Sequence, residues 1–120
     1  MDCIFCKIAN HEIPSKIVYE DDLVLAFLDV NPNKPGHTLI VPKKHIKDMD
    51  DMDDDTYLYI FKIAKEIKNK LIDKLNCDGI QLCQNNGDCQ EVKHYHLHLI
   101  PYYNSTIEMD IDTIYKKIMH

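Results

Sequence analysis

One stretch of the chain, residues 57–75, restricts the possible folds more than any other. Its apolar side chains recur at steps of three and four residues, the spacing of one face of an α-helix about five turns long. The members of this stripe are Tyr57, Ile60, Phe61, Ala64, Ile67, Leu71 and Leu75, and lysines occupy the wetter side of the helix. An amphipathic helix of this kind needs another layer of structure against which to bury its apolar face.

Short segments typical of β-strands lie on both sides of this helix, and they supply such a layer. Apolar and β-branched residues bounded by turn-forming residues predict strands at residues 16–20, 23–28, 37–41, 80–83 and 92–100. A short helix or turn is expected at residues 3–9 and a terminal helix at 111–118. Residues 48–55 are interpreted as a solvated acidic loop whose last aspartates cap the long helix. Strands separated by one long helix predict an α+β domain over residues 1–120 with a mostly antiparallel sheet.

Composition excludes several classes of protein. The chain has no apolar run near the roughly 20 residues of a membrane span, and its first residues lack the pattern of a signal peptide. We therefore expect a cytoplasmic protein that does not bind membranes. The net charge is −6, and all 14 basic residues are lysines without a basic stripe, which argues against nucleic-acid binding. Any bound phosphate must be contacted without the two-pronged guanidinium of arginine.

The stretch from Val92 to Ile100 carries the strongest functional signal. Alternate side chains of a strand point to opposite faces, so His94, His96 and His98 are expected to share one face of the predicted strand. Two chemistries fit three histidines arranged in this way. Imidazoles two residues apart can converge on a metal ion, and a neutral imidazole can act as a nucleophile near pH 7.

The five cysteines do not suggest a disulfide framework, because their number is odd and no export signal precedes them. Cys3 and Cys6 have the C-x-x-C spacing of metal ligands, although two free thiols would have the same spacing. The other three, Cys77, Cys83 and Cys89, are interpreted as small buried residues or inert thiols.

These motifs together resemble those of one known family. The run His94-x-His96-x-His98, preceded by Gln90-Glu91-Val92 and followed by Ile100-Pro101, resembles the signature of the histidine triad (HIT) family. Further blocks in the family's order lie at residues 3–8, 12–14, 18–21, 26–29, 35–37 and 41–45. The likeness covers residues 3–103 and points to the Hint-like branch common in bacteria. It implies the HIT-like fold, in which a five-stranded, mostly antiparallel sheet carries one long helix, a short N-terminal helix and a C-terminal helix.

The resemblance also implies a catalytic site for purine nucleotides. His96 would attack the α-phosphorus, and water would then release a nucleoside monophosphate from the nucleotidyl-histidine. His98 would contact the phosphate, His37 would complete a relay, and Gln90 would hold a phosphate oxygen. The residues implied for nucleotide binding are Phe5, Ile8, Phe27 and Val30 with Ile4 around the purine, Asp29 at the ribose hydroxyls, and Asn85 near the phosphate. On the residues alone, Phe5, Ile8 and Phe27 could simply belong to the core, and the residues around Asp29 favour a helix cap or turn.

The resemblance further implies a structural zinc ion held by Cys3, Cys6, His45 and His94. His94 would then serve the metal, and only His96 and His98 would serve the chemistry. It also implies a two-fold homodimer that pairs the long helix and extends the sheet, although the apolar stripe fits a monomer core equally well.

Two departures from the family pattern lie beside the triad. The loop between Asn85 and Gln90 is two residues shorter than in many relatives, and Glu91 stands where some relatives carry a hydroxyl. Three functions therefore stay open: a nucleoside phosphoramidase or related nucleotidyl hydrolase, a dinucleoside polyphosphate hydrolase, and a zinc-binding nucleotide sensor with little turnover.

Overall fold

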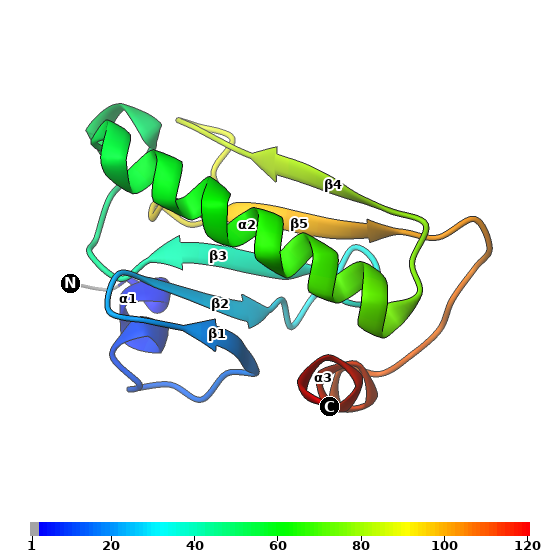
Figure 1. The fold of residues 1–120 in the computed structure, drawn as a ribbon. Coiled ribbons are helices and arrows are strands. Elements are labelled where there is room, and N and C mark those ends of the chain that lie inside the picture. Colours follow the sequence, from blue (N-terminus) through cyan, green and yellow to red (C-terminus); the bar gives the residue numbers. More distant parts are fainter. Residues whose placement is uncertain (1–2) are drawn as a thin grey trace.

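The computed structural model describes residues 3–120, so the domain predicted over residues 1–120 is described without its first two residues. Within this range, five strands form one antiparallel sheet in the order β1-β2-β3-β5-β4 (Figure 1). The strands are β1 (Ile17–Glu20), β2 (Val24–Leu28), β3 (Thr38–Pro42), β4 (Gly79–Gln84) and β5 (Leu97–Tyr102). The helices are α1 (Ile4–Ala9), α2 (Asp54–Leu75) and α3 (Ile111–Met119), with one 3₁₀ turn, η1 (Met49–Asp51). The predicted α+β class and five-stranded antiparallel sheet are confirmed.

The long helix α2 begins where the acidic run predicted it. The Asp53 carboxylate caps the helix by accepting a hydrogen bond of 2.8 Å from the Thr56 backbone N–H. Asp54 and Asp55 occupy the first turn, where negative charge favours the positive end of the helix dipole. The rest of the acidic run is not the solvated loop expected, because it contains η1 and buries Met52 in the main core. Among residues 3–120, no helix has both the length and the apolar content needed to cross a membrane.

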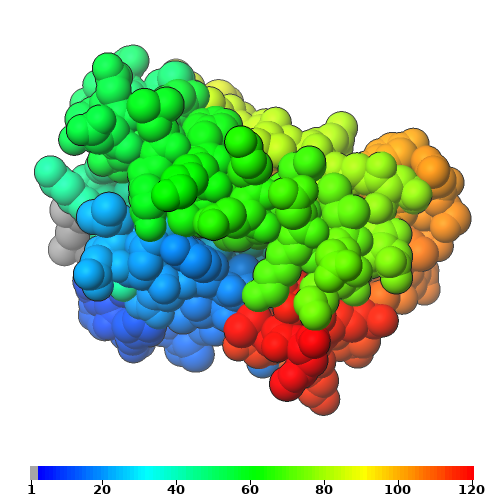
Figure 2. Space-filling view, in the orientation of Figure 1, coloured from blue at the N-terminus to red at the C-terminus, as the bar shows by residue number. Residues whose placement is uncertain are grey.

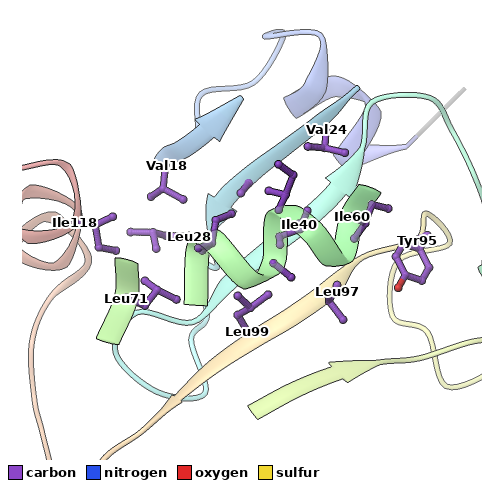
Figure 3. Packing of buried hydrophobic residues seen from close by; sticks show 14 of the residues in the cluster. Val18, Val24, Leu28, Ile40, Ile60, Leu71, Tyr95, Leu97, Leu99 and Ile118 are labelled. Carbon is purple, nitrogen blue, oxygen red and sulfur yellow. The ribbon is translucent and has the colours of Figure 1, made fainter. Parts of the chain in front are cut away.

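The main hydrophobic core lies between α2 and one face of the sheet. Figure 3 shows Ile60 and Leu71 of α2 directed at strand residues such as Ile40 and Leu99. The phase of the predicted stripe is shifted slightly, because Ile63 is buried while Tyr57 and Phe61 lie at the margin. The helix α3 closes one end of this layer with Ile114 and Ile118, and α2 and α3 together cover much of the face seen in Figure 2.

A second, smaller core lies on the opposite face of the sheet, beneath α1. In β2, Ala26 faces α2 while Leu25 and Phe27 face α1, so this strand is buried on both sides. Double burial explains why β2 is an uninterrupted apolar run rather than an alternating one. Phe5 of α1 packs edge-on against Phe27 with ring centroids 5.5 Å apart. The α1 side of the sheet is the side that carries the histidines.

The strand predicted at residues 92–100 is shorter at its start and longer at its end. β5 begins only at Leu97, because Ile40 opposite Leu97 is the last residue of β3 to pair with it. Before that point, the Tyr95 N–H donates to the Ile46 carbonyl at 2.6 Å, outside the sheet. At the other end β5 continues through Pro101, which pairs only with β4. A proline is tolerated there because β3 no longer pairs with β5 at that position, so that side of the strand needs no ladder hydrogen bond from it.

The turn before β3 depends on Gly36, which gives a test of the packing. Gly36 has a φ of +92°, and a Cβ atom there would lie 2.5 Å from Leu75 Cδ1. Gly36→Ala is therefore expected to lower the free energy of unfolding by about 2 kcal/mol, measured by urea denaturation. Gly87→Ala is the matched control, since Gly87 has a φ of +88° and nothing within 4 Å of the added atom. Equal losses in the two variants would contradict the proposed clash with Leu75.

Candidate active site

Two adjoining hollows open on the α1 side of the sheet. The first, of about 350 Å³, is largely apolar, and its lining includes the residues predicted for the purine: Ile4, Phe5, Ile8, Phe27 and Val30. The second, of about 260 Å³, is more polar and includes the predicted Asn85. Five residues line both hollows: Asp29, Asn31, Glu91, His96 and His98. The structure therefore brings two of the three triad histidines to the junction of the two hollows.

The proton on His96 can be assigned from its one backbone contact. Its Nδ1 lies 2.8 Å from the carbonyl oxygen of His94. A carbonyl only accepts hydrogen bonds, so Nδ1 carries the proton and donates it. In the neutral ring the lone pair is then on Nε2, the atom that can act as a nucleophile. The ring is held edge-on against Phe5, with centroids 5.0 Å apart.

His37 and His98 are linked by a hydrogen bond, and only one placement of the ring protons is consistent with both rings being neutral. The Asn33 N–H donates to Nδ1 of His37 at 3.0 Å, so Nε2 of His37 carries its proton. That Nε2–H donates to Nδ1 of His98 at 2.9 Å. His98 must therefore carry its proton on Nε2, which is available as a donor. The junction thus combines an unprotonated nitrogen on His96 with an N–H donor on His98.

Burial keeps this histidine chain neutral. Desolvation, reinforced by the neighbouring His96 and His37 and opposed by Asp29, lowers the pKa of His98 to about 4. Desolvation also lowers the pKa of His37, against the attraction of Asp29, whose carboxylate oxygen lies 3.8 Å from Nε2. Both rings are therefore neutral near pH 7, as the hydrogen-bond assignment requires.

The low pKa of His98 predicts a pH dependence of stability. An unfolded histidine binds its proton near pH 6.5, whereas folded His98 does so only near pH 4. Between these values the unfolded state binds more protons, so this contribution to stability is complete above about pH 6.5 and falls as the pH falls. Urea midpoints at about pH 7 and pH 5 should therefore drop further for the wild type than for His98→Gln. Equal drops would contradict the assignment of a low pKa to His98, and the other titratable groups, which are common to both proteins, cancel from the comparison.

Asp29 both forms a turn and faces the hollows. The turn-forming role and the ribose-binding role that the sequence left open are therefore compatible. One carboxylate oxygen accepts a hydrogen bond of 2.9 Å from the Asn31 N–H, which is the turn-forming contact. The other oxygen points toward His37. The half-buried carboxylate lies at the junction of the two hollows.

A second cluster of potential ligands lies beside the histidines, at the start of α1. Sγ of Cys3 lies 3.2 Å from Nδ1 of His94, and Sγ of Cys6 lies 3.2 Å from Nδ1 of His45. All four ligand atoms lie within 4.8 Å of one another. Tetrahedral zinc with sulfur and nitrogen ligands separates them by about 3.5 Å. Nε2 of His94 donates to the Pro42 carbonyl at 2.8 Å, which leaves the Nδ1 lone pair directed into the cluster.

The chemistry of this donor set fits a cation. Burial, together with the adjacent Cys3 thiol, raises the pKa of Cys6 to about 11, so without a cation the thiol keeps its proton. Burial also lowers the pKa of His94 to about 4, so that ring stays neutral as a ligand requires. Two thiols and two neutral imidazoles form a closed Cys₂His₂ set of the structural type.

The family model for the HIT domain matches residues 10–105 of the chain. The chain belongs to the HIT family. An uncharacterized HIT-like protein of Methanocaldococcus jannaschii is 46% identical, over 97% of this chain and 98% of its own length. An adenosine 5′-monophosphoramidase of Saccharomyces cerevisiae is 43% identical, over 82% of this chain and 61% of its own length. The crystal structure of a zinc-bound histidine triad protein from Mycobacterium smegmatis matches with a TM-score of 0.92 and 30% identity, over 99% of this chain and 91% of that chain.

The predicted HIT site residue that lies apart from the others is Gln90. Its side-chain amide donates to the Lys47 carbonyl at 2.8 Å, and its Oε1 accepts from the Gly87 N–H at 3.2 Å. Gln90 lines neither hollow, and its side chain holds the 85–90 loop together. A contact between Gln90 and phosphate therefore stays a prediction.

Two participants in this HIT site were not predicted from the sequence. Asn33 acts through its backbone N–H, which fixes the proton on His37, so its side-chain identity gave no signal. Glu91 was noted as a departure from the family, but its presence in the lining of both hollows was not predicted. Alternation of side chains gave no signal for Glu91, because a strand through this region would direct position 91 to the face opposite His94, His96 and His98, whereas β5 begins only at Leu97.

Proposed function

We propose that this HIT protein hydrolyses purine nucleoside 5′-phosphoramidates, or related nucleotides with P–N or P–O linkages, through a nucleotidyl-histidine intermediate. The observation that carries the proposal is the unprotonated Nε2 of His96 at the junction of an apolar and a polar hollow. The purine occupies the apolar hollow, and the carboxylate of Asp29 accepts hydrogen bonds from the ribose hydroxyls. This binding places the α-phosphorus beside His96 and His98.

The reaction then proceeds in two displacements at phosphorus. Nε2 of His96 forms a bond to the α-phosphorus while the P–N bond to the leaving amine breaks, and the amine takes up a proton from solvent water. The positive charge that develops on the His96 ring is stabilised by the bond from Nδ1–H to the His94 carbonyl. The Nε2–H of His98 contacts a phosphate oxygen, with its proton position maintained by His37. Water then attacks the phosphorus and loses a proton to solvent while the bond between the phosphorus and Nε2 breaks, which releases the nucleoside monophosphate and restores His96.

The relative named an adenosine 5′-monophosphoramidase supports P–N rather than P–O cleavage as the first activity to test. The test compares AMP release from adenosine 5′-phosphoramidate with release from diadenosine polyphosphates, alongside equilibrium binding of AMP. Faster turnover of the phosphoramidate supports the proposal, and faster cleavage of the polyphosphates favours the second enzyme. Tight AMP binding without release from either substrate favours a nucleotide sensor and overturns the proposal.

We further propose that Cys3, Cys6, His45 and His94 hold one structural zinc ion. The fit of the four ligand atoms and the zinc-bound relative from Mycobacterium smegmatis support this assignment. When bound, the ion would supply a cross-link that holds α1 to the loops carrying His45 and His94, and it would take no part in the displacement.

We also propose that the chain acts in the cytoplasm as one HIT domain over residues 1–120 and as a two-fold homodimer. Support for the dimer comes from two elements with exposed apolar side chains. The helix α2 exposes 67% of Leu58, and the edge strand β4 exposes 43% of Leu82. An edge strand is a site where a sheet can be extended by a second copy.

A further inference from the structure

The polar hollow has an unusual charge for a site that binds phosphate. Its lining includes two carboxylate side chains, those of Asp29 and Glu91. Among the described residues that line this hollow, none is a lysine, and the chain contains no arginine. The nearby Lys93 is directed to the 85–90 loop, where its Nζ donates to the Gly87 carbonyl at 2.8 Å. No cationic side chain in this lining offsets the two carboxylates.

The two carboxylates differ in the contacts that they already make with the protein. Asp29 accepts the Asn31 N–H and faces His37 with its other oxygen. The Glu91 carboxylate makes no hydrogen bond or ion pair with any other residue in the range 3–120, and its side chain is exposed. Its charge and its acceptor oxygens are therefore free for a ligand. A carboxylate can only accept hydrogen bonds, so the ligand group that it favours is a donor.

The position of Glu91 relates it to the leaving group. The apolar hollow suits the purine, and His96 and His98 mark the phosphorus at the junction. The group leaving from phosphorus then extends into the polar hollow, which Glu91 also lines. A polyphosphate leaving group would bring several negative charges beside two carboxylates. An amine bearing a second, positively charged nitrogen would meet an opposite charge there.

We propose that Glu91 determines specificity by selecting nucleotides whose leaving group carries a positive charge close to the phosphate, such as phosphoramidates of diamines. The inference rests on the proposed function and narrows its substrate class. Glu91 forms and breaks no covalent bond in this scheme. It contributes attraction to an ammonium group and repulsion of anionic leaving groups, which disfavours dinucleoside polyphosphates.

The test uses two inert analogues of the same size that differ only in charge. Both are adenosines with a 5′-O-sulfamoyl group in place of the phosphate, one N-(2-aminoethyl) substituted and the other N-propyl substituted. Titration calorimetry at low salt should show the wild type binding the ammonium analogue about 1.5 to 5 times more tightly, the range for a solvent-exposed ion pair. The preference should fall toward one in Glu91→Gln and invert in Glu91→Lys. It should also shrink in about 0.5 M salt, where the Debye length is a few ångströms.

Asp88→Asn is the matched control. It removes the same charge three residues away in the sequence, at an exposed residue that lines neither hollow, so it should preserve the wild-type preference. Equal affinities for the two analogues in the wild type would overturn the inference. An equal loss of preference in Asp88→Asn and Glu91→Gln would also overturn it, because the effect would then be one of net charge.

A turnover measurement separates this inference from the proposed function. The corresponding phosphoramidates are compared in wild type and Glu91→Gln by the ratio of their kcat/KM values. Cleavage with the same ratio in both proteins overturns the inference and leaves the proposed function standing. A preference that depends on Glu91 in binding, with neither phosphoramidate cleaved, supports the inference about the site and overturns the proposed activity.

Discussion

Replacing His96 with alanine is expected to lower kcat/KM for adenosine 5′-phosphoramidate by about 10⁴-fold or more, as for other enzymes that lose their nucleophile. The apolar hollow and Asp29 remain in this variant, so AMP binding should weaken by no more than about threefold. The loss of turnover is expected to be much larger than the loss of AMP affinity, because His96 meets the α-phosphorus through a single nitrogen. Its other nitrogen is occupied by the His94 carbonyl.

The decisive measurement is intact mass spectrometry of protein quenched in alkali during turnover, because the P–N bond of a nucleotidyl-histidine is labile in acid. The wild type should carry one adenylyl group per chain in its early turnovers, and His96→Ala should carry none. His120→Ala is a suitable control because His120 is exposed at the end of α3, outside both hollows, and should behave like the wild type. A His96→Ala protein that keeps more than about a tenth of the activity would exclude His96 as the nucleophile.

Removal of zinc is expected to cause the largest change in stability. A site loaded at about 1,000 times its Kd adds about 4 kcal/mol to the free energy of unfolding. For a domain of this size, that loss corresponds to a Tm lower by roughly 10–20 °C. Protein purified without chelator should contain about one zinc ion per chain by elemental analysis.

The variant Cys3→Ser separates the metal from the helix cap. The Cys3 side chain caps α1 by accepting from the Cys6 N–H at 3.2 Å, and serine is a good residue at that position. Loss of zinc and of thermal stability in this variant would therefore report the lost ligand rather than the lost cap. Cys83→Ser, an exposed thiol on β4 outside the cluster, should keep both. Zinc at less than about a tenth of an ion per chain, with no response to chelator, would exclude a structural metal.

Much of the fold was predictable because it follows from local periodicity. The steps of three and four in residues 57–75 indicated α2, and the aspartates before it indicated its cap. The limits of β5 were not predictable, because they depend on where β3 stops pairing and on the bond from Tyr95 to Ile46. Alternation of side chains identified the face on which the histidines lie, but not the residue at which the ladder begins.

The candidate site was predictable as a set of side chains and not as a set of proton positions. The protons on His96 and His37 are assigned by backbone groups, the His94 carbonyl and the Asn33 N–H. Every residue except proline offers the same backbone groups, so no pattern of residue types could single these out. The conformation of Gln90 was missed for a related reason, since its amide is satisfied by the carbonyl of Lys47, which is distant in the sequence.

His94 contributes to both sites through different parts of the residue. Its imidazole belongs to the ligand cluster with the cysteines, while its backbone carbonyl fixes the proton of His96. A substitution at position 94 removes the ring but leaves a peptide carbonyl in the chain. The proposed metal cluster and the proposed nucleophile are adjacent in space, yet mutation can therefore alter one without the other. A change of the His94 ring would remove one candidate ligand and keep the carbonyl that orients His96.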